Sequence, residues 1–272
     1  MNKKTYPKKY LGQNFLLNPP MQQKIINACE LKPTDVVLEI GPGKGALTKL
    51  IAPRVAKVIA IEKDRDLAQT LKTEFENSNV TIIEDDILHF LQRYQVPIQH
   101  KVPGTLKIIG NLPYNIATAI IEKAILHRRH FELFFMTVQL EHGKRMAAQP
   151  HTKDYGSFSC FVQLYTETKI LFRVPPAAFY PMPKVQSCFL KMNFLDHPSQ
   201  EVKNEDLLFK IIREAFGQRR KTIENSLAKL IGKEKLREYL AKLSIDSKSR
   251  AENLSLADYA KLTNFLVSSP SL

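Results

Sequence analysis

Runs of apolar, largely β-branched side chains alternate with helical patterns up to about residue 140. Each run has the length of a buried strand, and the runs lie at residues 36–40, 58–61, 80–83, 106–109 and 133–138. Near-continuous apolar strands that alternate with helices are typical of a parallel sheet covered on both faces. The pattern therefore predicts an α/β fold, in which ligands bind at the carboxyl ends of the strands.

The strand pattern stops at a polar stretch, residues 193–205. Beyond it, apolar residues recur at helical spacing: Leu207, Leu208, Ile211, Ile212 and Phe216, then Leu227, Leu230 and Ile231, then Leu236, Leu240 and Leu243. Ser255 is suited to cap a last helix that runs through Leu266. We therefore expect an α/β domain with a basic N-terminal arm over residues 1–195, and a small all-helical domain over residues 196–272.

The composition is that of a globular chain, because 44% of its 272 residues are apolar. Its longest apolar runs fall far short of the roughly 20 residues of a membrane-spanning helix, and its N-terminus has no apolar signal core. We therefore expect a cytoplasmic protein without a membrane partner. The three cysteines, Cys29, Cys160 and Cys188, lack metal-ligand spacing, so we expect reduced core thiols and no metal site. Nothing resembles a dimer seam, and we expect a monomer.

The charge balance points to a polyanionic partner. The chain has 40 Lys and Arg against 27 Asp and Glu, a formal net charge of +13. Scattered lysines would only keep a surface solvated, but many of these charges are clustered, which suits contacts to nucleic-acid phosphates. The clusters comprise Lys3, Lys4, Lys8 and Lys9 near the N-terminus and Arg213, Arg219, Arg220 and Lys221 in the helical domain. We expect both clusters to contact the phosphate backbone of a nucleic acid.

A glycine-rich segment, residues 38–45, lies where the first apolar strand should end and a helix begin. Glycines let the backbone turn sharply there and approach a ligand closely. About 20 residues later, Glu62 closes the next strand, where a carboxylate can accept both hydroxyl protons of a ribose. The pair predicts a nucleoside site. It leaves two interpretations open, because Gly41, Gly43 and Ala46 also satisfy the dinucleotide fingerprint of a dehydrogenase.

An acidic segment, residues 84–86, follows the third strand and places another carboxylate near the same crevice. Asp86 can accept protons from the amine of an adenine ring. The same letters also suit the start of a helix, where carboxylates favour the positive end of the dipole. The segment therefore supports a nucleoside site without establishing it.

The most specific chemistry lies in residues 110–116, Gly-Asn-Leu-Pro-Tyr-Asn-Ile, directly after the fourth strand. An aromatic amine is a poor nucleophile, so an enzyme that methylates it must aim its lone pair at the methyl donor. The Asn111 side-chain oxygen and the Leu112 carbonyl can accept the two N–H bonds of such an amine, while Pro113 stiffens the loop and Tyr114 stacks on the base. Carbonyl dipoles also stabilise the positive charge that develops on the nitrogen, so no strong general base is needed.

The sequence resembles the ribosomal RNA adenine dimethyltransferases over almost its whole length. The matching motifs, besides the glycine loop and the Asn-Leu-Pro-Tyr tetrapeptide, are residues 9–16, 60–64, 174–179, 181–187 and 215–222. The resemblance implies a Rossmann-like S-adenosylmethionine-dependent methyltransferase sheet with a small C-terminal helical domain. Within the family the chain is most similar to enzymes that dimethylate two adjacent adenosines near the 3′ end of small-subunit (16S) rRNA, in an immature small ribosomal subunit.

Carried onto this chain, the resemblance implies a set of site residues. The S-adenosylmethionine site is expected to contain Asn14, Leu16, Gly41, Glu62, Asp86 and Asn111. The adenine pocket is expected to contain Leu112, Pro113 and Tyr114, with Phe179 over the opposite face of a flipped base. Without the resemblance, Phe179 is interpreted as a core aromatic. Asn18 and Leu140 depart from the family's usual acidic residue and lysine, and they bear on RNA contacts rather than on the chemistry.

Three other functions compete with this interpretation. A large-subunit rRNA adenine methyltransferase that confers macrolide resistance shares the catalytic motifs, although the Arg219–Lys221 segment and the full helical tail favour the small-subunit enzyme. A nicotinamide dehydrogenase explains the glycine loop but gives residues 111–114 no role. A non-catalytic RNA-binding factor is disfavoured by the intact Asn111, Pro113 and Tyr114.

Overall fold

A computed structural model describes residues 7–93 and 106–269, apart from the side chain of Lys9. The chain forms two compact units. The first takes the chain up to residue 143 together with residues 168–194, and the second takes residues 144–167 together with the chain from residue 195 onward. The second unit begins near the expected boundary between residues 195 and 196, but it also includes residues 144–167. The expected domain boundary therefore stays a prediction.

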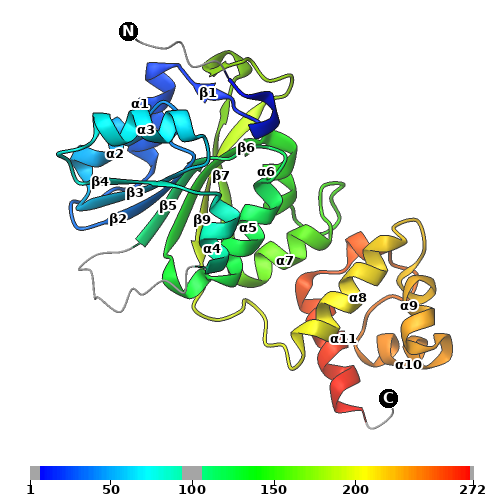
Figure 1. Cartoon of the computed structure of the whole chain (residues 1–272). Helices are drawn as coiled ribbons and strands as arrows, with labels where there is room; N and C mark the ends of the chain where they lie inside the picture. The colour runs from blue at the N-terminus through cyan, green and yellow to red at the C-terminus, as the bar shows by residue number, and fades with distance from the viewer. Residues whose placement is uncertain (1–6, 94–105, 270–272) are drawn as a thin grey trace. The chain divides into compact units, whose positions relative to one another are not determined.

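The first unit is built on a seven-stranded sheet with the order β4-β3-β2-β5-β6-β9-β7 (Figure 1). Its strands are β2 (Val36–Ile40), β3 (Lys57–Glu62), β4 (Val80–Glu84), β5 (Leu106–Asn111), β6 (Leu133–Gln139), β7 (Thr166–Val174) and β9 (Ser187–Phe194). β4, β3, β2, β5 and β6 pair in parallel, which confirms the five predicted strands and the predicted α/β class. The strand order reverses direction at β2, so a crevice forms at its carboxyl end, between the loops that follow β2 and β5.

Four strands were not predicted from the sequence. β9 runs antiparallel to β6, and β7 lies at the sheet edge beyond it. Polar side chains interrupt both strands, Lys191 and Asn193 in β9 and Glu167, Lys169 and Arg173 in β7, and β7 is buried only at its two ends, so both lack the continuous apolar signal of the central strands. The other two are a two-residue ribbon, β1 (Phe15–Leu16) paired antiparallel with β8 (Phe179–Tyr180), too short to show any periodicity.

Helices cover both faces of the sheet, with α1, α2 and α3 on one side and α4 and α5 on the other (Figure 1). They span α1 (Pro19–Ala28), α2 (Thr48–Ile51), α3 (Arg65–Glu74), α4 (Ile87–Arg93), α5 (Ala117–Leu126) and α6 (Leu140–Met146). Asn18 caps α1, because the Met21 N–H donates to its Oδ1 atom at 2.9 Å, and Pro19 and Pro20 occupy the first turn, where no N–H is needed. The asparagine at position 18 is therefore explained by its role as the N-cap of α1.

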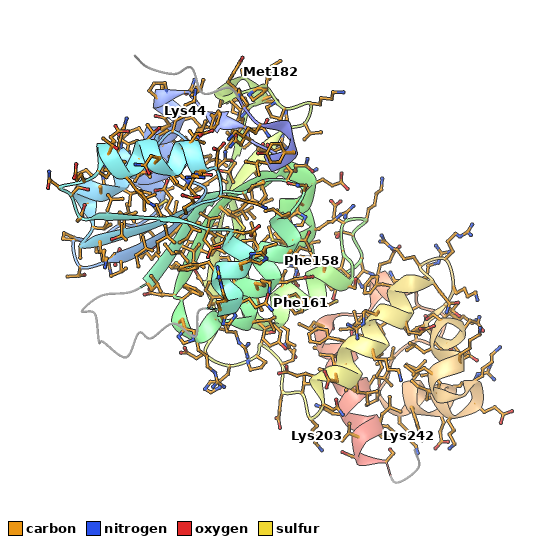
Figure 2. The ribbon with its side chains drawn as sticks, in the orientation of Figure 1. Lys44, Phe158, Phe161, Met182, Lys203 and Lys242 are labelled. Atoms are coloured by element: carbon orange, nitrogen blue, oxygen red, sulfur yellow. The ribbon has the colours of Figure 1, made fainter. Side chains whose placement is uncertain are left out.

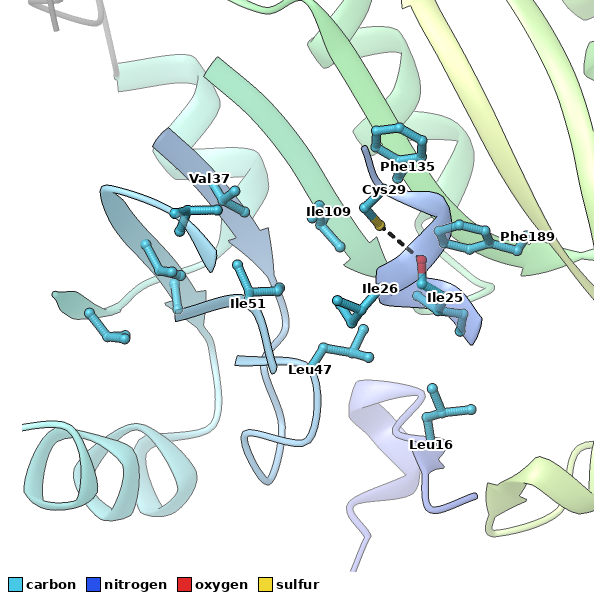
Figure 3. Close-up of a cluster of buried hydrophobic side chains, with 14 of the residues drawn as sticks. Leu16, Ile25, Ile26, Cys29, Val37, Leu47, Ile51, Ile109, Phe135 and Phe189 are labelled. Carbon is cyan, nitrogen blue, oxygen red and sulfur yellow. Dashed lines mark hydrogen bonds between the residues drawn. The ribbon is translucent and has the colours of Figure 1, made fainter. Parts of the chain in front are cut away.

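The core beneath α1 joins that helix to the sheet (Figure 3). Ile25 and Ile26 of α1 pack with Ile109 of β5 and Phe135 of β6, and all four side chains are buried. Cys29 lies in the same core, where its thiol donates to the Ile25 carbonyl at 3.2 Å. All three cysteines are free and buried, as expected for core thiols.

The second unit consists largely of helices: α7 (Ser157–Tyr165), α8 (Glu205–Gly217), α9 (Ile223–Ile231), α10 (Lys233–Lys242) and α11 (Leu256–Ser268). The last four confirm the helical tail predicted from the apolar spacing. Ser255 caps α11 as predicted, since the Asp258 N–H donates to its Oγ atom at 3.1 Å and the Asp258 carboxylate accepts in return.

Short 3-10 turns complete the elements of both units: η1 (Lys9–Leu11), η2 (Ala52–Arg54), η3 (Arg128–His130), η4 (Pro176–Ala178) and η5 (Ala251–Asn253). Among the residues that the structure describes, no helix is long and apolar enough to cross a membrane.

Candidate active site

A cavity opens at the carboxyl ends of β2, β3, β4 and β5, where the strand order predicts the crevice. Its volume of about 170 Å³ is more than tenfold the space that one water molecule needs, roughly 10–15 Å³. Five segments line it: residues 10–17 of the N-terminal arm, 39–47, 61–63, 85–87 and 111–116. The structure therefore brings together every sequence-predicted site residue except Phe179.

The loop after β2 is shaped by its glycines. Gly41 and Gly43 have φ angles of 63° and 59°, a region that L side chains rarely adopt. At Gly43 space also disfavours a side chain, because a Cβ atom would lie 3.1 Å from the Phe15 ring, which would have to shift by a few tenths of an ångström. At Gly41 and Gly43 the loop therefore has no side chain beside the cavity, so a ligand can approach its backbone closely.

Glu62 closes β3 and holds this loop in place. Its Oε2 atom accepts the Gly43 N–H at 2.9 Å, and its Oε1 atom accepts the Asp64 N–H at 2.8 Å. Burial raises the pKa of Glu62, although the backbone N–H groups of Asp64, Gly43 and Lys63 oppose the shift. A carboxylate has about four acceptor sites, so it can also accept from a ribose.

Asp86 lies at the cavity wall and also begins α4. Its Oδ1 atom accepts the Leu88 N–H at 2.8 Å, and its Oδ2 atom accepts from the Lys63 ammonium at 2.7 Å. Partial burial opposes ionisation, but these two donors outweigh it and lower the pKa of Asp86. Asp86 therefore has both of the roles considered from the sequence: it caps the start of α4, and it is an ionised acceptor at the cavity.

Glu39 is a cavity residue that the sequence reasoning missed. It lies on β2 two residues before Gly41 and is only 2% exposed. Its Oε2 atom has no hydrogen-bond partner in the part of the chain that the structure describes. Burial, together with the nearby negative charge of Glu62, raises the pKa of Glu39 to about 7, although hydrogen bonds with Thr48 oppose the shift. An acid inside an otherwise apolar strand was the available signal, because burying a carboxyl is costly.

Asn111 at the end of β5 is oriented by the N-terminal arm. Its Nδ2–H donates to the Asn14 carbonyl at 2.8 Å. Because a carbonyl only accepts, this contact assigns the amide nitrogen and leaves the Oδ1 atom of Asn111, a cavity residue, as an acceptor that no donor among the described residues occupies. The arm residue Asn14 thereby sets the direction of the carbonyl predicted to hold an amine.

The rest of the 111–116 segment is also fixed. The Leu112 N–H donates to the Thr137 carbonyl at 3.1 Å, and the Leu112 side chain is buried. The Tyr114 hydroxyl lies 2.6 Å from the Ser187 hydroxyl, which is fully buried on β9. Burial raises the pKa of Tyr114, so its hydroxyl stays neutral. A neutral, tethered aromatic ring at the cavity wall is suited to stacking on a base.

The N-terminal arm is tied down beside the cavity. Leu16 is buried on the β1–β8 ribbon, and its carbonyl accepts from the Gln22 side chain at 2.7 Å. Lys8 donates to the buried Asp64 carboxylate at 2.7 Å and to Asp66 at 2.9 Å. The arm therefore forms one wall of the site, and it holds Asn14 against Asn111.

Phe179 lies outside the cavity lining. It pairs with Leu16 across the ribbon, is 4% exposed, and belongs to the same buried cluster as Ala178 and Phe189. This is the position of the core aromatic that the residues alone suggest. Its predicted stacking on an adenine requires the ring to become accessible, and that role stays a prediction.

The two basic clusters differ in how far their charges are engaged. Lys3 and Lys4 lie outside the described residues, and so does the side chain of Lys9, while the charge of Lys8 is used within the fold. Arg219 forms an ion pair with Glu252 at 2.7 Å and donates to the carbonyls of Lys153 and Tyr155. The remaining members are exposed, namely Arg213, Arg220 and Lys221.

No group of three or more His, Cys, Asp or Glu side chains suited to a metal ion occurs within residues 7–93 and 106–269. The donors at the cavity are carboxylates, amides and backbone groups. They suit a nucleoside and an amino group better than a metal centre.

Comparison with known proteins agrees with this geometry. The ribosomal RNA adenine dimethylase family matches residues 4–268. The chain is 41% identical over 269 residues to the ribosomal RNA small subunit methyltransferase A of Pelotomaculum thermopropionicum, covering 95% of this chain and 90% of that protein. The crystal structure of a dimethyladenosine transferase from Plasmodium falciparum superposes with a TM-score of 0.76 at 26% identity, covering 93% of this chain and 97% of that one. The 23S rRNA methyltransferase ErmE shares the fold, with a TM-score of 0.71 at 24% identity and coverage of 94% and 100%.

Proposed function

We propose, from the premise that the chain belongs to the ribosomal RNA adenine dimethylase family, that it dimethylates the N6 amines of two adjacent adenosines in 16S rRNA. The proposed methyl donor is S-adenosylmethionine. The proposed substrate is the region near the 3′ end of that RNA in an immature small ribosomal subunit. A role in small-subunit biogenesis and a cytoplasmic location follow from that substrate.

The cavity residues fit S-adenosylmethionine. The bare backbone at Gly41 and Gly43 admits a ligand at the strand ends, and Glu62 retains acceptor sites for two ribose hydroxyls. Asp86 is an ionised acceptor for the amine of an adenine ring, and the partnerless Oε2 atom of Glu39 is suited to a donor on the ligand. When bound, the cofactor supplies a methyl group on a positively charged sulfur.

The observation that carries the proposal is the orientation of Asn111. With its amide N–H committed to the Asn14 carbonyl, its Oδ1 atom accepts one N–H of the target amine, and the Leu112 carbonyl accepts the other. These contacts favour a pyramidal nitrogen with its lone pair directed away from them. Both dipoles stabilise the positive charge that forms on the nitrogen as the methyl group arrives. The proton leaves to solvent after transfer, because the methylated amine is then strongly acidic.

Tyr114 positions the base. Its ring stacks on the flipped adenine, and the contact between its hydroxyl and Ser187 fixes the ring. Pro113 restricts the backbone between Leu112, which is proposed to hold the amine, and Tyr114, which is proposed to stack on the base. Dimethylation requires that the monomethylated amine bind again with its remaining N–H toward one of the two acceptors, so a pocket with two carbonyl oxygens suits both rounds.

The small subunit is favoured over the large subunit by similarity. The relative with 41% identity is named for the small subunit, whereas the likeness to the 23S enzyme concerns the fold. A dehydrogenase gives Asn111 and Tyr114 no role, and a non-catalytic RNA-binding factor gives the oriented Asn111 amide none.

Isotope transfer tests the proposal. The protein is incubated with S-adenosylmethionine labelled in its methyl group and with immature small or large subunits, and the labelled nucleoside is identified and mapped. We expect dimethyladenosine at two neighbouring positions of the small-subunit RNA. Label in the large subunit alone would refute the substrate, and no transfer to either RNA would refute the activity.

A further inference from the structure

An exposed apolar surface adjoins the catalytic cavity. It consists of Leu17, Tyr180, Met182 and Val185, which are exposed to 49%, 53%, 67% and 45%, and we refer to it as the ribbon surface. Large apolar side chains that gather at one place on a protein mark an interaction site more often than isolated ones do. None of the four has a role in the chemistry described above.

The β1–β8 ribbon explains why these side chains point outward. Phe15 pairs with Tyr180, and Leu16 pairs with Phe179. Because side chains alternate across a strand, Leu16 and Phe179 face the core, while Phe15 and Tyr180 share the outer face. On that face Phe15 lies against the glycine loop and is only 8% exposed, whereas Tyr180 is exposed. Leu17 continues this outer face, since its N–H donates to the Ala178 carbonyl at 2.9 Å.

Both ends of the ribbon surface reach catalytic residues. At one end, Leu17 itself lines the cavity. At the other end, the exposed segment 180–186 leads directly into Ser187, whose hydroxyl holds Tyr114. The ribbon surface is therefore connected to the cavity through Leu17 and to the Tyr114 contact through Ser187.

Positive charges accompany the apolar side chains. Lys184 lies within the segment and is exposed. Lys44, also exposed, has its ammonium 5.0 Å from the centre of the Phe15 ring, on the outer face of the ribbon. Figure 2 labels Lys44 and Met182 at the same end of the first unit. Apolar and aromatic side chains next to lysines suit a ligand with flat apolar rings and a negatively charged backbone, which describes unpaired nucleotides.

We propose that the ribbon surface binds the unpaired nucleotides next to the adenosine being methylated, with a neighbouring base stacked on Tyr180. The inference rests on the proposed function and extends it. A base that is extruded into the cavity leaves its neighbours without a stacking partner, at a cost of a few kcal/mol. The exposed Tyr180 ring and the Met182 side chain replace that partner and lower the cost of extrusion.

The test compares Tyr180→Ala with Tyr180→Phe. The probe is a fluorescently labelled single-stranded RNA with two adjacent adenosines and three flanking nucleotides on each side, and its duplex serves as a second probe. Stacking on an aromatic side chain contributes about 1–3 kcal/mol, so Tyr180→Ala should weaken single-strand binding roughly 5- to 150-fold. Tyr180→Phe keeps the ring and should bind within about twofold of the unchanged protein. Binding of the duplex should not respond to either substitution.

Two further variants complete the design. Met182→Ala should weaken single-strand binding in the same direction and guards against a folding defect in one variant. Leu126→Ala is the matched control, because Leu126 is 68% exposed at the last residue of α5, the end away from the catalytic loop. It should bind both probes as the unchanged protein does. Affinity for S-adenosylhomocysteine, measured by calorimetry, should be the same for all four variants.

The results separate this inference from the proposed function. If Tyr180→Ala and Met182→Ala bind the single strand as tightly as the unchanged protein, the ribbon surface does not bind RNA. If Tyr180→Ala lowers the salt dependence of binding, it acts through phosphates rather than a stacked base, and the inference fails. If it only abolishes self-association in sedimentation, the surface binds a second copy, and the inference fails as well. Absence of methyl transfer by the unchanged protein refutes the proposed function instead, while the binding data still decide on the surface.

Discussion

Replacing Glu62 by alanine removes two interactions that are present before any ligand binds. The Glu62 carboxylate accepts the N–H groups of Gly43 and Asp64, so it fixes the glycine loop and the turn after β3. Both N–H groups lose a charged acceptor in the alanine variant. We therefore expect Glu62→Ala to lower both the free energy of unfolding and the affinity for S-adenosylmethionine.

The two effects have different sizes. A hydrogen bond to a charged group contributes about 1.5–3 kcal/mol, but Gly43 is only partly buried and water can replace part of its bond. Burial also raises the pKa of Glu62, which shows that its ionised form is partly penalised in the fold. We therefore expect the unfolding free energy to fall by about 2–4 kcal/mol in total. The cofactor loses an acceptor for two ribose hydroxyls, about 1–3 kcal/mol or roughly 5- to 150-fold in affinity.

Urea unfolding without ligand and calorimetry with S-adenosylmethionine measure the two quantities separately. Glu84→Ala is the matched control, because Glu84 pairs with Glu62 in the neighbouring strand but is exposed and does not line the cavity. It should change neither quantity by more than about 0.5 kcal/mol. A folded Glu62→Ala variant with unchanged cofactor affinity would remove Glu62 from the binding site. Unchanged stability would show that its backbone contacts do not hold the loop.

Three other outcomes are expected. The pKa of Glu39 is raised in the fold from 4.5 to about 7, so its carboxyl lowers the stability of the fold as the pH rises through that range. Glu39→Gln should therefore raise the unfolding free energy by at most about 3 kcal/mol at pH 8 and by almost nothing at pH 4. An equal gain at both pH values in urea unfolding would contradict this. Ser187→Ala and Tyr114→Phe each remove the contact between the two hydroxyls, so each should lower kcat severalfold, and the double variant should be no slower than either single variant. Additive effects on kcat would show that the two hydroxyls act independently. Replacing Arg220 and Lys221 by glutamine should reduce the log–log salt slope of RNA binding by about 0.7–0.9 for each phosphate that is no longer neutralised, and an unchanged slope would mean that the tail cluster only faces solvent.

The central strands and the position of the cavity could be predicted from the sequence because their signals are local. Five buried parallel strands leave continuous apolar runs, and the glycines after β2 mark the point where a ligand can approach. β7 and β9 could not be found in the same way, since polar side chains interrupt both strands and most of β7 is at least partly exposed. The β1–β8 ribbon joins segments more than 160 residues apart, and a local sequence pattern cannot predict such a pairing.

The site shows the same division between local and long-range information. Glu62 and Asp86 follow strands and were found by position, whereas Glu39 was interpreted as part of an apolar strand. The link between Asn14 and Asn111 joins residues 97 positions apart, so the reason for the direction of the Asn111 carbonyl emerged only from the fold. Charge counting likewise treated Lys8 as an RNA-binding residue, although its ammonium is paired with the buried Asp64.

The account depends most on the claim that Asn111 orients the target amine for methyl transfer. The direct measurement is the single-turnover rate of methyl transfer by Asn111→Ala, with RNA and cofactor affinities determined on the same preparation. We predict that the rate falls more than tenfold while RNA affinity stays nearly constant, because the Asn111 carbonyl acts during transfer rather than in holding the RNA backbone. A rate that falls only as far as RNA binding falls, or that does not fall at all, would contradict the claim.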